Sequence, residues 1–480
     1  MLAASRFSRV RSNKRDMMKI QCTLDVSLME AVEKCREKAL NSPILRAYLS
    51  SAVKNIIGKT GFSLQTQVKK ADGSLDSALN DSIEWAWYDF GKLSNGFLTV
   101  DGGLGHNDFD ALILRTLLVD GEVFIRIHHP ASHPYGLSFE LIDSLSIDYT
   151  KRHEFSNGTA CVLGIEIDER WRPLKYYIKK GTTTVYQAGK EEEVPASEII
   201  HIFKKERAEQ TRGIPPFSAC YNALEDLDEY RDYELLAAKV SSVENIFYER
   251  NGMGVQGDFI SQQEQDDKGA FMQDIESFTA SIVPTGYNVK TLTPTHPNNG
   301  FGEFTKSVLT QVAASLGVSY AKLLKDYGAV NYSSLREGTL DEAAFYAEQQ
   351  SFLIEAWKEI EFKLFIEALA LSSDIIKPSQ VKDILMHHTW VCQKRAYFDK
   401  GKDILGDERE LKLGLKSPLM LMEANGDDPE EIMRSWKQYE TMCNSYGLSF
   451  PVTEKDAAPT QEESFDDEAA QNEELNKARG

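Results

Sequence analysis

Arg212-Gly213-Ile214-Pro215-Pro216-Phe217 is the stretch from which the fold can be read, because the apolar pattern changes across it. After it, apolar residues recur every three and four positions, the period of one helix face. The paired prolines fit the start of that helix, where a missing backbone N–H costs little. Asn251-Gly252 has the turn chemistry that ends it. The apolar positions of this predicted helix are Cys220, Leu224, Leu227, Tyr230, Ala237, Val240, Val243 and Phe247.

Before that stretch, from Glu122 to Lys204, the apolar period is two, which is typical of half-buried strands. Asn157-Gly158 and Lys180-Gly181 supply turns between them. This region therefore predicts antiparallel sheet. The alternating apolar positions are Val123, Ile125, Ile127, Phe139, Leu141, Val162, Ile165, Ile167, Tyr177, Ile200 and Ile202.

Further toward the N-terminus the pattern is helical over residues 28–57 and again over 75–120, apart from a glycine-rich break at 101–105. Within the first region, Ser42-Pro43 has the form of an N-cap followed by proline at the first helical position. Gly58 is expected to end that run.

Toward the C-terminus, Leu335 to Ala370 predicts one helix of about 54 Å. Residues 281–290 predict a hairpin or small sheet, and 372–450 are expected to be helical, with a start at Asp428-Pro429. The predicted core face of the long helix is Leu353, Trp357, Ile360, Leu364 and Ala368. Its predicted charged outer face is Glu355, Lys358, Glu359, Glu361 and Lys363.

The composition is that of a globular protein, with 480 residues of which 42% are hydrophobic and 27% charged. No run of 18 apolar residues predicts a membrane-spanning helix, and the first six residues have no apolar segment typical of a secretory signal. The six cysteines form no Cys-x-x-Cys pair, so we expect reduced core residues.

Acidic residues outnumber basic ones by 74 to 54, which gives a net charge of −20. Proteins that grip nucleic acid usually carry an excess of Lys and Arg, because their affinity comes largely from phosphate neutralisation. Tight nucleic-acid binding is therefore not expected, although handling nucleic acid without holding it remains compatible with this charge.

The two ends of the chain carry opposite charge and lack apolar periodicity, so both read as mobile arms. The first 27 residues form a basic N-terminal arm, and residues 457–480 form an acidic flexible tail. They either confer solubility alone or dock on neighbouring chains.

No catalytic, cofactor or metal residues are predicted. Gly58-Lys59-Thr60 lacks the earlier glycine of a phosphate-binding loop, since position 53 is Val. Adjacent side chains point in different directions on a strand or a helix, so the histidine pairs at 128–129 and 387–388 are not placed to bind one metal ion together. Ser319 and Lys322 fit a Ser-x-x-Lys pattern that is too short to indicate an enzyme by itself.

Several distinctive blocks follow one another along the chain: Asn41-Ser42-Pro43 with 53–58, then 115–124, 212–217 with 224–240, 316–320 with Asp326 and 331–336, and 414–417 with 426–431. Together, and in this order, they resemble the lambda-type tailed-phage portal protein family. One departure is Asp399-Lys400-Gly401-Lys402-Asp403, where that family usually has Asp-Pro before Lys-Glu.

The resemblance implies an α+β, mainly helical, portal-type subunit with an α/β wing, long stem helices, a small β-containing clip and a helical crown. Mapped onto this chain, it implies a wing over 28–215, stem helices over 216–320 with the clip near 276–300, a tunnel loop and long helix over 321–371, and a crown over 372–456.

The resemblance also implies a homo-oligomeric ring, normally of twelve subunits, at one vertex of a viral capsid. Double-stranded DNA passes through it during packaging and ejection. The implied partners are the terminase large subunit, the major capsid protein or scaffold, and head-completion or tail connector proteins. No membrane partner is implied. The implied location is the virion, after assembly in the host cytoplasm.

A basic channel would bind DNA at every step, so the net charge leads us to expect a predominantly acidic channel wall. The tunnel loop is expected just before the long helix, although the same segment could be a simple helix–helix connection. Its expected DNA-facing residues are Lys325, Asp326, Tyr327, Gly328, Ala329, Val330 and Asn331. The alternatives are another head-assembly or connector protein, or a Ser–Lys hydrolase using Ser319 and Lys322.

Overall fold

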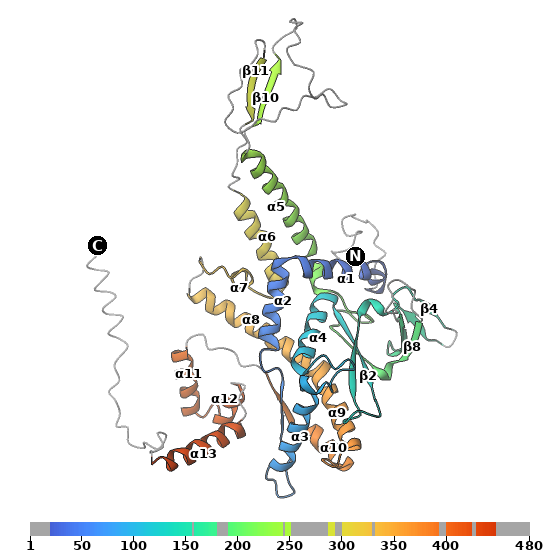
Figure 1. Cartoon of the computed structure of the whole chain (residues 1–480), viewed down its shortest axis with the longest axis vertical. Helices are drawn as coiled ribbons and strands as arrows, with labels where there is room; N and C mark the ends of the chain where they lie inside the picture. The colour runs from blue at the N-terminus through green and yellow to red at the C-terminus, as the bar shows by residue number, and fades with distance from the viewer. Residues whose placement is uncertain are drawn as a thin grey trace, which may run out of the picture. The chain divides into compact units, whose positions relative to one another are not determined.

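The computed structural model describes residues 20–155, 158–179, 191–242, 245–250, 287–292, 300–328, 332–392, 400–424 and 429–447. It divides into two compact units, Met1–Gln393 and Lys394–Gly480. The fold is α+β and mainly helical, as predicted (Figure 1). Most of the expected N-terminal arm, all of the acidic tail and most of the expected clip lie outside the described residues.

Four helices open the first unit, and local signals set their ends. Ser42 is extended before Pro43, which confirms the predicted helix start. Asp76 caps the third helix by accepting a hydrogen bond from the backbone N–H of Leu79. Gly121 ends the fourth at a φ of 86°. The helices are α1 (Ile20–Asn41), α2 (Pro43–Ile56), α3 (Ser77–Phe90) and α4 (His106–Asp120).

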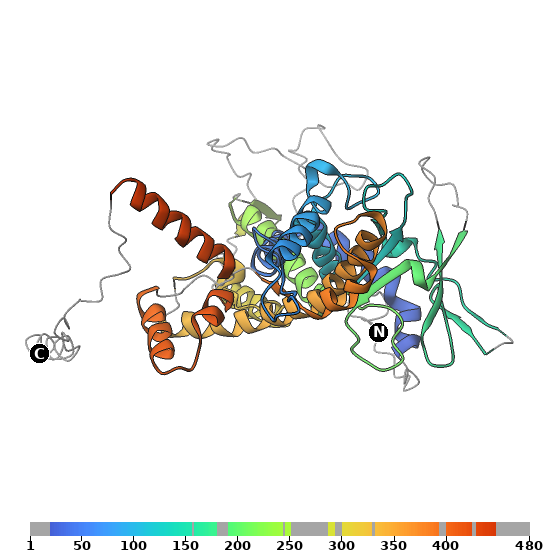
Figure 2. The ribbon, with the colours of Figure 1, turned by 90° about the horizontal axis from the view of Figure 1, so that it is seen from below.

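The strands predicted between Glu122 and Lys204 are antiparallel, and they divide into two sheets that lie together on one side of the helices (Figure 2). One has the order β3-β2-β9 and the other β4-β5-β6-β7-β8. The first comprises β2 (Glu122–His128), β3 (Ser138–Ile142) and β9 (Ile199–Phe203). The second comprises β4 (His153–Glu154), β5 (Ala160–Val162), β6 (Ile165–Ile167), β7 (Pro173–Lys179) and β8 (Glu191–Pro195).

A hairpin of two helices, α5 (Tyr221–Ser242) and α6 (Phe301–Ser315), extends from this unit and is called the stem hairpin below (Figure 1). The prediction of helix as far as Phe247 was wrong, because that residue lies in β10 (Asn245–Arg250). β10 pairs antiparallel with β11 (Tyr287–Leu292), so the strand expected in 281–290 pairs with a segment distant in sequence. Residues 281–286 lie outside the described part of the chain.

The predicted long helix consists of α8 (Tyr332–Leu353), one π-helical turn (Ile354–Lys358) and α9 (Glu359–Ser372). Trp357 is buried as predicted, but Ile360 is partly exposed. The predicted charged outer face was wrong at Lys358 and Glu361, which are both fully buried. A π turn holds an additional residue, so it rotates all following side chains relative to an unbroken α-helix.

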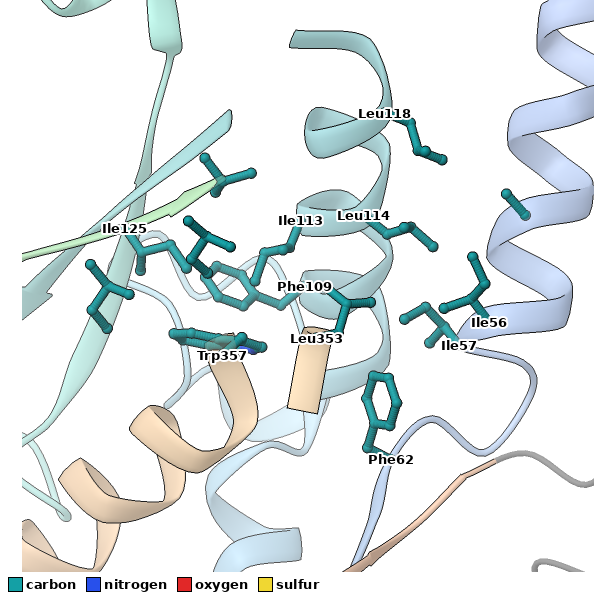
Figure 3. Close-up of a cluster of buried hydrophobic side chains, with 14 of the residues drawn as sticks. Ile56, Ile57, Phe62, Phe109, Ile113, Leu114, Leu118, Ile125, Leu353 and Trp357 are labelled. Atoms are coloured by element: carbon teal, nitrogen blue, oxygen red, sulfur yellow. The ribbon is translucent and has the colours of Figure 1, made fainter. Parts of the chain in front are cut away.

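The main core lies where α2, α4, β2 and the π turn meet (Figure 3). Fully burying a large aliphatic or aromatic side chain contributes about 1.5–3 kcal/mol, so this cluster fixes how these elements pack. The residues labelled there are Ile56, Ile57, Phe62, Phe109, Ile113, Leu114, Leu118, Ile125, Leu353 and Trp357.

The first unit extends past residue 372, where the crown was expected to begin. β12 (His388–Val391) pairs antiparallel with β1 (Ser63–Thr66), so the segment up to 393 packs with the N-terminal half. The remaining helices of this unit are α7 (Tyr320–Leu324) and α10 (Val381–Met386).

The second unit contains α11 (Lys400–Lys412), α12 (Pro418–Ala424) and α13 (Pro429–Ser445). α13 begins at Pro429, as the sequence predicts, while its expected cap Asp428 lies outside the described residues.

Candidate functional site

Glu122, at the start of β2, lies at the centre of a buried ionic group that connects the sheets to the stem hairpin. The Arg212 guanidinium donates to its carboxylate through Nη2 at 2.6 Å and through Nε at 2.9 Å. The backbone N–H of Gly213 and a ring nitrogen of His201 contact its other oxygen at 2.8 and 3.1 Å. The remaining Arg212 donors reach the carbonyl oxygens of Leu163 and Ser144. We call Glu122, Arg212, His201, Gly121 and Gly213 the joint.

The electrostatics of the joint favour a charged pair. Burial alone would raise the pKa of Glu122, but the charge of Arg212 and the contact with His201 lower it to about 2. Burial lowers the pKa of His201, whose ring stacks on Phe124 with centroids 4.1 Å apart. Arg212 lies over the same Phe124 ring at 5.4 Å.

Backbone contact between Gly121 and Gly213 brings the two chain segments of the joint together. A Cβ on Gly213 would lie 2.2 Å from the Gly121 carbonyl oxygen, and one on Gly121 would lie 2.2 Å from the Ile214 carbonyl carbon. Only glycine permits this approach. Since Arg212 and Gly213 lead through Pro215 into α5, the joint fixes where the stem hairpin leaves the sheets.

A second buried ionic group holds the π turn. Lys358 Nζ lies 2.6 Å from Glu361 and 3.3 Å from Asp110 of α4. Asp110 also accepts from the Trp357 indole at 2.8 Å, and His106 lies 3.1 Å from Glu361. The π turn directs both Trp357 and Lys358 into the core. We call Lys358, Glu361, Asp110 and His106 the Lys358 cluster.

Burial and ion pairing compete in the Lys358 cluster, and a different one prevails at different members. Burial opposes the charged form of Lys358, but Asp110 and Glu361 raise its pKa. Burial likewise opposes the charge of Glu361, whose pKa Lys358 and His106 lower. Burial raises the pKa of Asp110, although the positive charge of Lys358 acts to lower it. Sequence analysis missed this cluster, because Lys358 and Asp110 lie far apart in sequence.

The segment predicted to face DNA connects α7 to α8. Lys325 ends α7 in the left-handed conformation at a φ of 58°, and Asp326 accepts a hydrogen bond from the backbone of Gly328. Tyr327 is 48% exposed. Ala329, Val330 and Asn331 lie outside the described residues.

Glu342, a buried carboxylate of α8, holds α7 against α8. It accepts from the backbone N–H and the hydroxyl of Ser319 at 2.8 and 2.7 Å, and it pairs with Lys322 Nζ at 2.6 Å. Close packing of Gly317 against Phe345 adds a second contact, since a Cβ there would lie 2.8 Å from the ring. Glu342 therefore anchors α7 to α8.

The same geometry gives Ser319 and Lys322 structural roles. The Ser319 hydroxyl caps α7 by accepting from the Lys322 backbone N–H, and the Lys322 ammonium pairs with Glu342 rather than with the hydroxyl. In the part of the chain that the structure describes, no group of three His, Cys, Asp or Glu is placed to hold a metal ion. Over those same residues, no helix is long and apolar enough to span a membrane.

The stem hairpin has unequal charge on its two helices. α5 contains six acidic and two basic residues, whereas α6 contains Glu303 and Lys306 alone. The helices are held together by aromatic contacts of Tyr230 with Phe301 and Phe304, at centroid distances of 5.5 and 5.1 Å. The exposed acidic residues of α5 are Asp226, Glu229 and Asp232.

Comparison with known proteins adds independent findings. The sequence model described as "Phage portal protein, lambda family" matches residues 8–350. The chain is 29% identical to the probable portal protein of Halomonas phage phiHAP-1 over 83% of this chain and 78% of that one. It is 21% identical to portal protein B of Escherichia phage lambda over 82% of this chain and 80% of that one.

Among solved structures, a chain from the virion of a native gene transfer agent particle matches with a TM-score of 0.45 and 12% identity. A chain from the neck of an empty particle matches with a TM-score of 0.46 and 13% identity. Both matches cover 83% of this chain and 94% of the other.

Proposed function

The chain belongs to the lambda family of phage portal proteins, and from this membership we propose that copies of it form the ring through which DNA enters and leaves a viral head. The family match over residues 8–350 is the observation that carries the proposal, because it includes the joint and the stem hairpin. In this ring the chain has no reaction of its own, and the terminase motor supplies the energy.

We further propose that α5 supplies much of the channel wall. Its net charge is −4 from six acidic and two basic residues. Duplex DNA carries about one negative charge per 1.7 Å, so an acidic wall repels it and a basic wall would retain it. Screening over about 8 Å at physiological salt confines this repulsion to the immediate surface and lets the duplex slide.

The segment from Lys325 to Asn331 is proposed as the loop that touches DNA. Its described part supports this role, because Tyr327 is half exposed and the preceding helix α7 is anchored by Glu342. A half-exposed aromatic side chain that follows an anchored helix is suited to steric contact with a moving polymer.

The proposed partners outside the ring are the terminase large subunit, the major capsid protein or scaffold, and the proteins that complete the head or join the tail. The proposed place of the ring is a single vertex of the virion capsid, after assembly in the host cytoplasm. Family membership is the support for these assignments.

The mass of the purified full-length particle tests the proposal. One chain has a mass of 54.1 kDa, so a dodecamer has a mass of about 650 kDa. Native mass spectrometry combined with electron microscopy should show closed rings with an axial hole. A chain that stays monomeric at high concentration and across salt conditions contradicts the proposal.

A further inference from the structure

The helix α7 leads directly into the segment proposed to touch DNA, but it is too short to hold its own place. It has five residues, Tyr320–Leu324, and a helix shorter than about 12 residues is marginal without tertiary contacts. Lys325 ends it, and Tyr327 comes two residues later. The contacts that fix α7 therefore also fix where the described part of this segment starts.

One side of α8 receives α7 and the residues before it (Figure 1). Gly338, Glu342 and Phe345 follow at spacings of four and three residues, so they lie on the same side of the helix. A Cβ on Gly338 would lie 3.9 Å from the Cβ of Ser319, and one on Gly317 would lie 2.8 Å from the Phe345 ring. The chain thus packs against α8 one turn before Glu342 and one turn after it.

Glu342 supplies the polar contact between these two packing points. Its side chain is almost fully buried, and its carboxylate accepts from both the backbone N–H and the hydroxyl of Ser319. The Lys322 ammonium lies 2.6 Å from it. Hydrogen bonds to an ionised group are about twice as strong as neutral ones, so all three contacts are strong. Ser319 caps α7 and Lys322 lies within it, so this one carboxylate holds the helix at two points and fixes its rotation as well as its place.

Between α7 and Tyr327 the direction of the chain is set locally. Lys325 has a φ of 58° and a ψ of 30°, the left-handed conformation that residues other than glycine rarely adopt. Asp326 then accepts from the backbone N–H of Gly328 at 3.3 Å, which closes a turn around Tyr327. Because both features lie within the segment, the direction of the Tyr327 side chain follows from the orientation of α7.

We propose that Glu342 is a positioning residue for the contact with DNA: it holds α7 on α8 and thereby sets the direction in which Tyr327 meets the duplex. This inference rests on the proposed function, in which Tyr327 touches DNA. Glu342 itself is buried and acts only through α7. A side chain that is already ordered loses less conformational entropy on contact, so a positioned Tyr327 retains DNA better than the same side chain after a loosely held helix.

A double-mutant cycle on the retention of packaged DNA tests this proposal. Glu342→Gln keeps the size of the side chain and removes its charge, and Tyr327→Ala removes the aromatic ring. Phage particles that carry each variant, or both, are compared by the amount of nuclease-protected DNA. We expect each single variant to retain several-fold less DNA than the wild type. The double variant should retain as much as Tyr327→Ala alone, because Glu342 then has no ring to position.

Two further variants complete the cycle. Glu337→Gln makes the same chemical change at an exposed position of α8 and should leave DNA retention unchanged. Lys322→Met weakens the contact from the side of α7, while Ser319 still donates to Glu342. It takes the place of Glu342→Gln if that variant does not assemble, and the same pattern is expected.

The other outcomes overturn the proposal, and they separate it from the proposed function. A purely structural role lowers DNA retention by the same factor with and without Tyr327. A Glu342→Gln ring that retains DNA like the wild type, beside a Tyr327→Ala ring that does not, shows that Glu342 positions nothing. Normal retention in Tyr327→Ala particles contradicts the DNA contact itself, and the absence of any ring contradicts the portal function.

Hydrogen exchange measured by mass spectrometry on purified rings gives a second readout. The amides of Leu323 and Gly328 donate hydrogen bonds within α7 and the turn that follows it. In Glu342→Gln their peptide should exchange about fivefold faster, because α7 opens more often, while the strand β2 exchanges as in the wild type. Unchanged exchange of this peptide means that other contacts hold α7, which overturns the proposal.

Discussion

Arg212 and Glu122 form a two-point ion pair inside the protein, with N–O distances of 2.6 and 2.9 Å and with the carboxylate fully buried. One residue begins a strand of the three-stranded sheet, and the other precedes the first stem helix. The pair is therefore the point where the three-stranded sheet holds the segment that leads into the stem hairpin.

Replacing Arg212 by Met should destabilise the chain strongly. The substitution leaves the Glu122 charge buried without its cation, a loss that typically costs about 3–5 kcal/mol. Urea unfolding of the unassembled protein measures it. The double variant Arg212→Met, Glu122→Gln should recover part of the loss, because it also removes the orphaned charge; a single variant as stable as the wild type contradicts the assignment.

Stability should fall in acid through the same pair. The pKa of Glu122 is about 2 in the folded chain against an ordinary 4.5, so the folded form binds the proton less tightly than the unfolded form. Its contribution is complete above about pH 4.5 and is lost as pH falls toward 2, amounting to about 3 kcal/mol. Burial lowers the pKa of His201, which adds a loss of the same sign below its ordinary 6.5.

The variant Glu122→Gln isolates the carboxylate in this titration. It lacks the titrating group, so its unfolding free energy should change less between pH 4.5 and 2 than that of the wild type. Parallel pH profiles for the two proteins are incompatible with the low pKa.

Replacing Lys358 by Met should also destabilise the chain, by about 3–5 kcal/mol, because Asp110 and Glu361 then lose their shared cation. Lys363→Met is the matched control in the same helix, since Lys363 is exposed. The control should change stability by less than about 0.5 kcal/mol. Thermal unfolding of both variants checks the prediction, and equal effects at the two positions count against the buried cluster.

Ser319→Ala should behave as the loss of a helix cap. The hydroxyl caps α7 and donates to Glu342, so its removal should cost about 1 kcal/mol and leave ring assembly intact. Ser319→Thr keeps the hydroxyl and should recover most of that loss. Loss of a hydrolytic activity from an otherwise stable Ser319→Ala ring would instead favour an enzyme.

The variant Tyr327→Ala distinguishes two hypotheses for this segment, a loop that contacts DNA and a simple connection between helices. The side chain is 48% exposed, so stability and ring mass should stay within error of the wild type. Packaging efficiency or retention of packaged DNA should fall several-fold in particles that carry the variant. Unchanged packaging and retention support a helix–helix connection with no contact to DNA.

The sequence predicts the elements whose signals are local. Ser42-Pro43 and Asp428-Pro429 mark helix starts because capping chemistry lies within a few residues, and α2 and α13 begin at those prolines. The strands from Glu122 to Phe203 follow from a period of two. Trp357 is buried where the helical period places it.

The features that sequence reasoning missed depend on distant partners. The π turn changes the helical phase, and nothing in Ile354–Lys358 itself signals the extra residue. In the sequence pattern Lys358 falls on a solvated face, because its partner Asp110 is on another helix. Phe247 continues a helical spacing by chance, whereas pairing with Lys290 places it in a strand.

The contact of Gly121 with Gly213 restricts what mutation can do at these two positions. Every side chain larger than hydrogen meets main-chain atoms at 2.2 Å on one segment or the other, and no rotamer change relieves an overlap that involves a β-carbon. Saturation of both codons, followed by selection for infectious particles, should return glycine at each. Genetic drift can therefore reshape the stem hairpin and the sheets on either side while the crossing point of these two chain segments stays unchanged.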